Sequence, residues 1–441
     1  MFKKVLIATR GVPALRIIRS CRELGVKTVV PYSEEDRDSL PAMLADEAIC
    51  IGPAPPPDSY ANLSRLLSAA EVTRCDSLHP GWGFLASEPE FADATIASGI
   101  NFIGPSPDCL RMFADRLEVR ATIKGAEIPV IPGADYPIVN PASAAKVCDE
   151  LGLPCVVKPV ATRLPCTRII RKEKDIEYQV RMCQAETRVR TGSEQVVIEK
   201  FLSPVRPIEI QIVADTQGNI RVINDWEILL YFRGKNFLAV SPALNIDKKE
   251  REQLFSWAKE AGKATKITGC VTVEFLIDQE ARAYFSRFYP ELSVFHPLTE
   301  VRTGIDVIEE QMKVASGERV VSFERDVTLP PIALATQIFA EDPDADFEPS
   351  PGLVNDLWLP SGPGVRVDSH LFPGYTVPPD YDLHIATVIA SGADFESAKR
   401  RLLRALTETR INGIATNLDF LITAIKHPNF GTGKIFGQED Y

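Results

Sequence analysis

Short apolar runs alternate with stretches of helical spacing along the N-terminal part of the chain. Residues 4–9 (KVLIAT) form an apolar run followed by Gly11, a pattern typical of a buried parallel strand and a turn. Residues 13–24 then carry apolar side chains on one helical face, and residues 28–31 form the next run. This order predicts the βαβ opening of a doubly wound domain. Further segments of this alternation lie at 48–51, 61–70 and 101–103.

The pattern changes after an expected linker helix that ends near residue 126. Helical spacing at 142–151 and 174–185 alternates with short strand-like runs, which predicts a small compact lobe. From residue 208 onward β-rich segments dominate, and an expected helix at 248–268 interrupts them. These features together indicate an α/β protein with more than one domain.

Composition narrows the class of protein. The chain has 441 residues, of which 45% are hydrophobic and 25% charged, the profile of a globular protein of two to four domains. Its net charge of -11 disfavours a general binder of nucleic acid or of anionic membranes, because both need a basic surface. The longest apolar runs are shorter than the roughly 18 residues of a membrane span.

Nine cysteines are scattered along the chain without a CxxC pair. Neither a structural zinc site nor a disulfide framework is therefore expected. Reduced and mostly buried thiols are typical of a cytoplasmic protein, and the first residues have the pattern of a strand and not of a signal peptide. The sequence predicts a cytoplasmic location.

Several specific strings occur in a fixed order. They include IATRGVPALRIIRSCRELGVKT (7–28), HPGWGFLASEPEFA (79–92), EIQIVAD (209–215), HPLTEVRTGIDVIEEQ (296–311) and GVRVDSHLFPGYTVPPDYD (364–382). Together they resemble biotin carboxylase, the ATP-grasp subunit of acetyl-CoA and related carboxylases, over nearly the whole chain. The family's reaction phosphorylates bicarbonate with ATP and then carboxylates biotin on a carrier protein.

The resemblance implies the fold and its divisions. It implies an α/β ATP-grasp fold of the biotin carboxylase type, in which ATP lies between a lid and the body of the protein. The expected parts are an N-terminal Rossmann-like domain (1–113), a linker helix (114–130), a lid lobe (131–203) and a large mixed α/β C-terminal domain (204–441).

The resemblance also implies a nucleotide site. The matching residues are Arg116, Lys158, Glu199, Lys200 and Leu202. In the family, glycines follow the lysine that matches Lys158, and their backbone N–H groups fold over the phosphates. Here residues 159–167 (PVATRLPCT) contain two prolines and no glycine. The sequence therefore predicts a vestigial site, with weak or absent binding of ATP and Mg²⁺ and no cofactor.

The positions that match the metal and bicarbonate sites are also altered. Of the two family carboxylates for Mg²⁺, Glu274 is kept and Arg287 replaces the other, and a cation there repels a metal ion. Glu291 stands for the arginine that holds bicarbonate, and Phe295 stands for the glutamate that acts as base. The other pocket positions are Arg233, Lys235, Val294 and Gln337. No intact catalytic or metal site is predicted.

The residues that match the family's dimer interface are altered less than those that match its catalytic site. They are Arg16, Arg19, Glu23 and Arg366. A homodimer, or a heterodimer with an active biotin carboxylase, is therefore expected. None of the five methionines belongs to a Met-Lys-Met biotinylation motif, so no covalent biotin is expected, and the biotin carrier protein and the carboxyltransferase are expected to be separate chains.

Three hypotheses about function follow from the sequence. The leading one is an inactive, biotin carboxylase-like subunit with a structural or regulatory role in a biotin-dependent carboxylase or carboxyltransferase complex. The second is an ATP-dependent ligase of the biotin carboxylase type with a remodelled pocket. The third is a sensor of a nucleotide or another metabolite.

Overall fold

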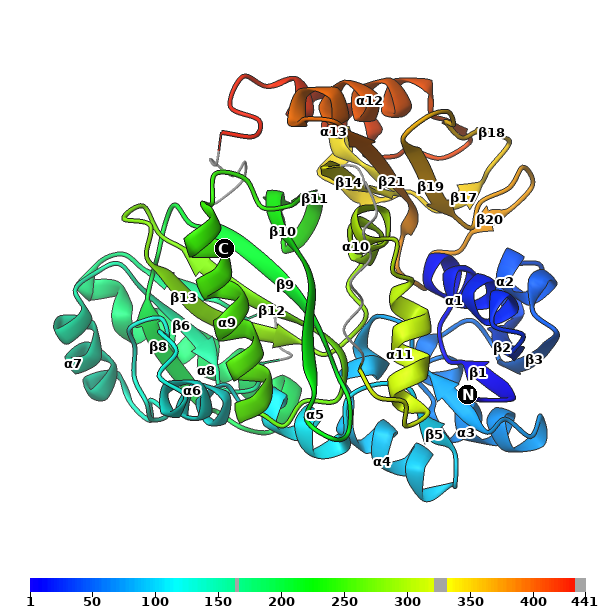
Figure 1. Cartoon of the computed structure of the whole chain (residues 1–441). Helices are drawn as coiled ribbons and strands as arrows, with labels where there is room; N and C mark the ends of the chain where they lie inside the picture. The colour runs from blue at the N-terminus through cyan, green and yellow to red at the C-terminus, as the bar shows by residue number, and fades with distance from the viewer. Residues whose placement is uncertain (163–165, 321–330, 433–441) are drawn as a thin grey trace.

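Five parallel strands form the N-terminal sheet of the computed structural model, which describes residues 1–162, 166–320 and 331–432 (Figure 1). The strand order is β3-β2-β1-β4-β5, the doubly wound arrangement that the apolar alternation predicts. The strands are β1 (Lys4–Ile7), β2 (Lys27–Ser33), β3 (Glu47–Gly52), β4 (Ser77–His79) and β5 (Asn101–Phe102). The helices are α1 (Gly11–Glu23), α2 (Leu40–Leu44), α3 (Leu63–Val72) and α4 (Pro89–Ala97).

Two helices, α5 (Pro107–Ala114) and α6 (Arg116–Gly125), connect this sheet to a small lobe. Asp115 separates them and caps α6, because its carboxylate accepts from the backbone N–H groups of Leu117 and Glu118. The lobe contains a three-stranded antiparallel sheet of order β7-β6-β8, with two helices packed against it. Its elements are α7 (Pro141–Leu151), β6 (Cys155–Pro159), β7 (Arg168–Ile170), α8 (Ile176–Thr191) and β8 (Val196–Lys200).

An eight-stranded antiparallel sheet forms the body, in the order β13-β12-β9-β10-β11-β14-β21-β19. The strands are β9 (Arg206–Ala214), β10 (Ile220–Phe232), β11 (Lys235–Ser241), β12 (Gly269–Ile277), β13 (Ala283–Tyr289), β14 (Ile332–Phe339), β19 (Val365–Ser369) and β21 (His384–Gly392). The helices are α9 (Lys248–Ala264), α10 (His296–Thr303), α11 (Val307–Ala315), α12 (Phe395–Glu408) and α13 (Leu418–Lys426). Short strand pairs at the edge are β15 (Glu341–Asp342) with β16 (Glu348–Pro349), β17 (Gly352–Leu353) with β20 (Thr376–Val377), and β18 (Asp356–Trp358) with β22 (Arg410–Asn412).

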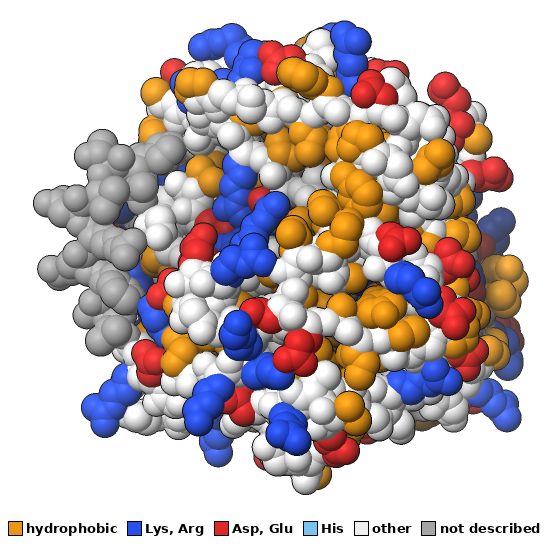
Figure 2. All heavy atoms as spheres, turned by 90° about the vertical axis from the view of Figure 1, so that its right-hand side faces the viewer, with side chains coloured by type: hydrophobic (Ala, Val, Ile, Leu, Met, Phe, Trp, Pro, Cys, Tyr) orange, Lys and Arg blue, Asp and Glu red, His pale blue; other side chains and the backbone are white. Residues whose placement is uncertain are grey.

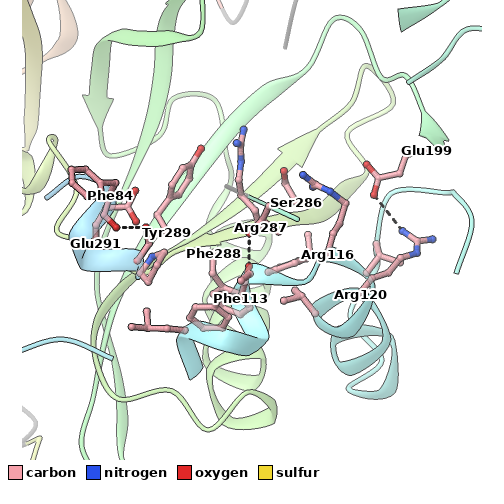
Figure 3. Close-up of a pocket in the computed structure, with 18 of the residues that line it drawn as sticks. Phe84, Phe113, Arg116, Arg120, Glu199, Ser286, Arg287, Phe288, Tyr289 and Glu291 are labelled. Atoms are coloured by element: carbon pink, nitrogen blue, oxygen red, sulfur yellow. Dashed lines mark hydrogen bonds and ion pairs between the residues drawn. The ribbon is translucent and has the colours of Figure 1, made fainter. Parts of the chain in front are cut away.

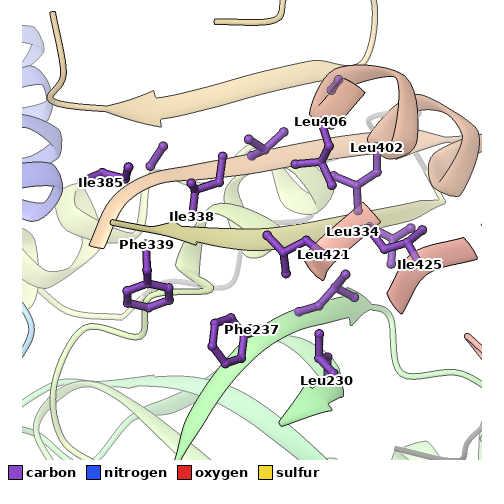
Figure 4. Close-up of a cluster of buried hydrophobic side chains, with 14 of the residues drawn as sticks. Leu230, Phe237, Leu334, Ile338, Phe339, Ile385, Leu402, Leu406, Leu421 and Ile425 are labelled. Carbon is purple, nitrogen blue, oxygen red and sulfur yellow. The ribbon is translucent and has the colours of Figure 1, made fainter. Parts of the chain in front are cut away.

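The largest described hydrophobic core lies between this sheet and its C-terminal helices (Figure 4). Phe237 on β11 and Ile338 on β14 face Leu402 on α12 and Leu421 on α13, and all four are almost fully buried. Burial of each such side chain contributes roughly 1.5–3 kcal/mol. This core fixes the long sheet on which the candidate site is built.

Two expected helices differ in length from the structure. The helix expected at 174–185 continues to Thr191 and ends at Gly192, which has a left-handed φ of 75°. The helix expected at 248–268 ends at Ala264, because Lys266 adopts a positive φ of 50° before β12 begins. In the described part of the chain, no helix is both long and apolar enough to cross a lipid bilayer.

Candidate active site

A cavity of about 340 Å³ lies where the small lobe, the linker helices and the edge of the large sheet meet (Figure 3). Its walls include Phe84 from the N-terminal domain, Arg116 and Arg120 from α6, and Glu199 from β8. The other wall is the end of β13 and the following turn, residues 285–291. Segments far apart in the sequence therefore contribute side chains to one pocket.

Positively charged side chains are concentrated around one end of this cavity. Arg116 is the first residue of α6, and its Nε donates to the carbonyl oxygen of Pro159 at 3.2 Å. Arg120 donates to Asp135 at 2.7 Å. Lys158 on β6 lies 3.0 Å from Glu199. Burial lowers the pKa of both Arg116 and Lys158, because it disfavours their charged forms by more than the nearby charge of Glu199 favours them.

Glu199 is the carboxylate that partly balances this charge. Its burial raises its pKa, but Lys158 and then Arg116 outweigh that effect, so the pKa lies below its ordinary value. The charged form of Glu199 is therefore favoured. Neighbouring residues have other contacts: Lys200 donates to the Gly152 carbonyl at 2.8 Å, and Leu202 packs beside Ile131.

Strand pairing brings Glu274 and Arg287 together. Glu274 on β12 is the register partner of Arg287 on β13, and Arg287 Nε donates to Glu274 Oε1 at 3.0 Å. Tyr289, two residues further along β13, donates to Glu274 Oε2 at 2.9 Å. Burial raises the pKa of Glu274, but Arg287 and the hydrogen bonds lower it further, so the net shift is downward. The strand edge thus holds an ionised carboxylate beside a guanidinium.

Glu209 is a second buried carboxylate in this region. It lies on β9 directly opposite Glu274 and accepts from Trp226 Nε1 at 2.7 Å. Burial, followed by repulsion from Glu274, raises its pKa to about 8. Sequence reasoning gave Glu209 no role, although a glutamate in the apolar alternation of residues 209–215 is a signal of a buried charged group.

Glu291 and Phe295 lie in different surroundings. Glu291 lines the cavity, and burial raises its pKa. Phe295 is only 1% exposed and packs with Trp226 and Leu298 in a hydrophobic cluster, against which Val294 also lies. Phe295 therefore supports the wall behind the site, whereas Glu291 faces the space where a substrate could bind.

Three further positions of the expected site lie around the turn between β10 and β11, and the described lining of the cavity does not include them. Lys235 forms an ion pair with Glu341 and lies 4.5 Å from the centre of the Phe339 ring. Arg233 pairs with Asp346. Gln337 donates to the carbonyl oxygen of Asn236 at 2.6 Å. Acidic or carbonyl oxygens thus already contact these three side chains.

The loop that follows Lys158 is described only in part. The positions 163–165 of the glycine-free segment 159–167 lie outside the described residues. At the start of the loop, Thr162 donates through its backbone N–H to the Ala114 carbonyl at 3.0 Å and through its hydroxyl to the Phe113 carbonyl at 2.6 Å. These bonds attach this part of the loop to the end of α5.

Of the expected interface residues, two form a network within the chain. Arg16 on α1 pairs with Glu300 and Asp306 at 2.8 Å each, and Arg366 on β19 pairs with Glu300 at 2.6 Å. Arg19 and Glu23 are instead exposed on α1. Figure 2 shows the face of the molecule that lies on the right in Figure 1, the side of α1, and hydrophobic side chains gather there among charged ones.

The residues present fit a nucleotide with its magnesium ion. Cationic side chains suit phosphate oxygens, and magnesium is usually bound by one or two carboxylates together with substrate phosphates. Glu274 is ionised, whereas Glu209, across the sheet from it, has a pKa raised to about 8 and keeps its proton at neutral pH. Among the described residues, no group of three histidine, cysteine or carboxylate side chains could hold a metal ion on its own, so phosphate oxygens would have to complete the coordination.

Comparison with known proteins defines the class of this fold and site. Family models match residues 1–110 (biotin carboxylase, N-terminal domain), 115–322 (carbamoyl-phosphate synthase L chain, ATP binding domain) and 335–438 (biotin carboxylase C-terminal domain). A biotin carboxylase structure from Campylobacter jejuni, described as a β,γ-ATP complex, superimposes with a TM-score of 0.94 at 34% identity, over 98% of this chain and 96% of that one. The protein therefore has the ATP-grasp fold of biotin carboxylases.

Curated relatives define the family more narrowly. Biotin carboxylase 1 of Bacillus subtilis is 40% identical over 98% of this chain and 97% of its own length. The biotin carboxylase of Pseudomonas aeruginosa is 37% identical over 99% and 97%, respectively. The chain belongs to the biotin carboxylase family, a family of ATP-dependent ligases.

Two expectations from the sequence are corrected by these comparisons. The inactive subunit is contradicted, because relatives that are 35–40% identical over nearly the full length are biotin carboxylases. The expectation of no cofactor, with weak or absent binding of ATP and Mg²⁺, is contradicted as well. A Hydrogenobacter thermophilus neighbour, with a TM-score of 0.94 and 32% identity over 99% of this chain and 96% of that one, is described with MgADP and bicarbonate. Both expectations rested on replacements at positions matched to the family, whereas the folded cavity combines Arg116, Arg120 and Arg287 with Glu199.

Proposed function

We propose that the protein is an ATP-dependent ligase of the biotin carboxylase type with a remodelled pocket. One observation carries the proposal: Arg116, Arg120 and Arg287 line the cavity, whose described carboxylates are Glu199 and Glu291, and Lys158 contacts Glu199. Such a surplus of cations favours a polyanion such as a nucleoside triphosphate. The expected lid lobe (131–203) and C-terminal domain (204–441) would enclose that substrate between them.

In this proposal the chain's own residues bind and orient the nucleotide. Arg116 and Lys158 pair phosphate oxygens, and Glu199, Lys200 and Leu202 form the edge that receives the base. Glu274, together with phosphate oxygens, would hold magnesium, which supplies charge neutralisation on the phosphates when bound.

The wall of the pocket that contains Glu291 would bind its substrate differently from the matching part of the family's site. Burial raises the pKa of Glu291, so this side chain holds a proton more readily than an exposed glutamate does. A protonated carboxyl group donates a hydrogen bond and can therefore face bicarbonate or another carboxylate. Arg287, four residues away, supplies the positive charge on the same wall.

The direct test measures ATP cleavage by the purified full chain. Phosphate release should increase when bicarbonate and free biotin are added together, and Glu274→Gln should lose this increase. Arg111→Ala, an exposed arginine that pairs with Asp93 and Asp108, should keep it. ATP cleavage that does not respond to bicarbonate and biotin, although magnesium nucleotide binds, would contradict the proposed reaction.

We also propose that the chain forms a dimer and acts with a separate biotin carrier protein and a separate carboxyltransferase. The Hydrogenobacter thermophilus neighbour is described as a domain dimer, and Arg19 and Glu23 lie exposed on α1. Light scattering of the purified chain should give the mass of a dimer, and Arg19→Glu should lower it. A monomer mass for the unaltered chain would favour pairing with a different biotin carboxylase chain.

We also propose that the protein works in the cytoplasm. All nine cysteines lie in the described part of the chain, where none forms a disulfide and eight are buried. This pattern supports work in a reducing compartment such as the cytoplasm.

A further inference from the structure

Four of the nine cysteines lie in the small lobe, and two of them face each other. Cys166 comes just before β7, and Cys183 lies on α8. Their sulfur atoms are 3.4 Å apart. Both side chains belong to the buried core of the lobe, so the backbone holds the two thiols together from segments that are separate in the sequence.

A carboxylate and a guanidinium lie beside this thiol pair. The Cys166 thiol donates to Glu186 Oε2 at 2.8 Å, and Arg168 forms an ion pair with the other oxygen of Glu186. Hydrogen bonds from Cys166 and then from Arg168 lower the pKa of Glu186. Glu186 is therefore ionised, while burial and then the hydrogen bond to Glu186 raise the pKa of the Cys166 thiol, so Cys166 rests as a thiol whose proton points to Glu186.

The two thiols differ in exposure. Cys166 is 6% exposed and Cys183 is completely buried, so a small oxidant reaches the Cys166 sulfur first. Hydrogen peroxide, which is close in size to a water molecule, is such an oxidant. Cys166 should therefore react with the oxidant first, and Cys183 should then react with the oxidised Cys166.

We propose that Cys166 and Cys183 form a redox modification site that a peroxide converts into a disulfide. The Cys166 sulfur attacks the peroxide, the O–O bond breaks, and a sulfenic acid and one water molecule form. The Cys183 sulfur then attacks the Cys166 sulfur, the S–O bond breaks, and a second water molecule leaves. The Cys166 proton passes by way of Glu186 to the first departing hydroxide, and the Cys183 proton goes to the second. In total two thiols and one peroxide give one disulfide and two water molecules. This proposal does not depend on the proposed function.

The geometry needs little change for this bond to form. The sulfur atoms must approach from 3.4 Å to about 2.05 Å, the length of a disulfide bond. The product would join the start of β7 covalently to α8, both of which pack on β6, the strand that carries Lys158. A thiol–disulfide change would thus tie together the elements behind the cationic side of the cavity.

Other cysteines provide matched controls. Cys109 is buried on α5, and its sulfur donates to the Thr265 carbonyl at 3.7 Å. Cys50 is exposed and donates to the Gly52 carbonyl at 4.0 Å. Cys109 is a control for a buried thiol that has no second thiol facing it in the manner of Cys166 and Cys183. Oxidation of the exposed Cys50 shows that the oxidant has reacted with the protein.

The experiment maps the thiols of the full chain after treatment with hydrogen peroxide and alkylation. Trypsin should release peptides 164–168 and 182–188 as one cross-linked species, and dithiothreitol should separate them. Oxidation of Cys50 without this species, or a link from Cys166 to any other cysteine, would overturn the proposal.

Two variants sharpen the result. Cys183→Ser should abolish the cross-link and leave Cys166 as a sulfenic acid that dimedone labels, whereas Cys109→Ser should give the same amount of cross-link as the unaltered chain. Glu186→Gln should slow labelling of Cys166 several-fold if Glu186 relays the proton. Equal dimedone labelling at Cys166 with and without Cys183 would contradict the second step.

Discussion

Glu209 and Glu274 lie opposite each other on neighbouring strands but hold their protons differently. Arg287 and Tyr289 contact Glu274 and keep its pKa low, whereas burial and the charge of Glu274 raise the pKa of Glu209 to about 8. The ordinary pKa of a glutamate is 4.5. Between these two values the folded protein binds a proton at Glu209 that the unfolded chain has released. Glu209 thus stabilises the fold fully below pH 4.5, and this contribution falls as the pH rises toward 8.

Glu209→Gln should remove this dependence on pH. Glutamine keeps an oxygen for the Trp226 hydrogen bond, and it cannot ionise. The unaltered chain should lose up to about 1.4 kcal/mol of stability per pH unit from Glu209 between pH 4.5 and 8. Thermal unfolding at pH 5 and pH 8 should therefore show a smaller fall in Tm for the variant. An equal fall in both proteins would mean that Glu209 is not protonated in the native state.

Arg116 should contribute directly to nucleotide affinity if the proposed function is right. A hydrogen bond to a charged group contributes roughly 1.5–3 kcal/mol, so Arg116→Ala should weaken ATP binding at least about ten-fold. Isothermal titration with Mg-ATP measures the change. Arg111→Ala, which removes an exposed arginine outside the cavity lining, is the matched control and should bind as the unaltered chain does.

At the scale of elements, the start of α10 shows how packing decides the role of a residue. Phe295 is the N-cap residue of α10, and its ring lies in the cluster between that helix and strands β10, β11 and β14. A glutamate at this position would have to leave the cluster or be buried with a charge. The phenylalanine instead anchors the helix to the sheet.

Phe295→Ala should destabilise the protein strongly. Removing a fully buried phenylalanine costs about 3–5 kcal/mol, and urea unfolding measures the loss. Phe84→Ala, at a phenylalanine that is 56% exposed, should change stability by no more than about 0.5 kcal/mol. Similar effects of the two substitutions would show that the cluster around Phe295 contributes little.

At the scale of the whole molecule, one ion-pair network joins three separate parts. Glu300 on α10 accepts from Arg16 on α1 and from Arg366 on β19. Asp306 forms a second ion pair with Arg16, and Asp368 forms a second ion pair with Arg366. Burial raises the pKa of both aspartates, but Arg16 and Arg366, respectively, lower it further, so both stay ionised. Their contribution is present above their unfolded pKa near 3.8 and is lost as the pH falls through the lower folded value.

Glu300→Gln should weaken the contact between the N-terminal domain and the body. The largely buried guanidinium groups of Arg16 and Arg366 would lose the carboxylate that they share. Breaking a buried ion pair costs roughly 3–5 kcal/mol. The cost should be smaller here, because Asp306 and Asp368 still pair with the two arginines. A lower Tm measures the effect. Glu47→Gln breaks an exposed pair with Lys4 and should cost no more than about 1 kcal/mol. A Tm for Glu300→Gln as high as that of Glu47→Gln would exclude a structural role for the network.

The sequence by itself determined the elements and the family. Strands and helices could be predicted from local periodicity, and the apolar patterns of residues 4–9 and 13–24 predicted the opening of the parallel N-terminal sheet. The ordered strings along the chain indicated the family. The candidate nucleotide residues Lys158 and Glu199 were assigned from the resemblance to the family. Such features depend on neighbours in the chain.

Only the tertiary structure decided which side chains share a site. The pairing of β9, β12 and β13 places Glu209, Glu274 and Arg287 on one stretch of sheet, and a contact across strands is set by register and not by local sequence. Packing likewise placed Phe295 in a core and Cys166 beside Cys183. Charge and proton affinity in a buried site depend on the sum of such distant neighbours, which the order of residues along the chain does not show.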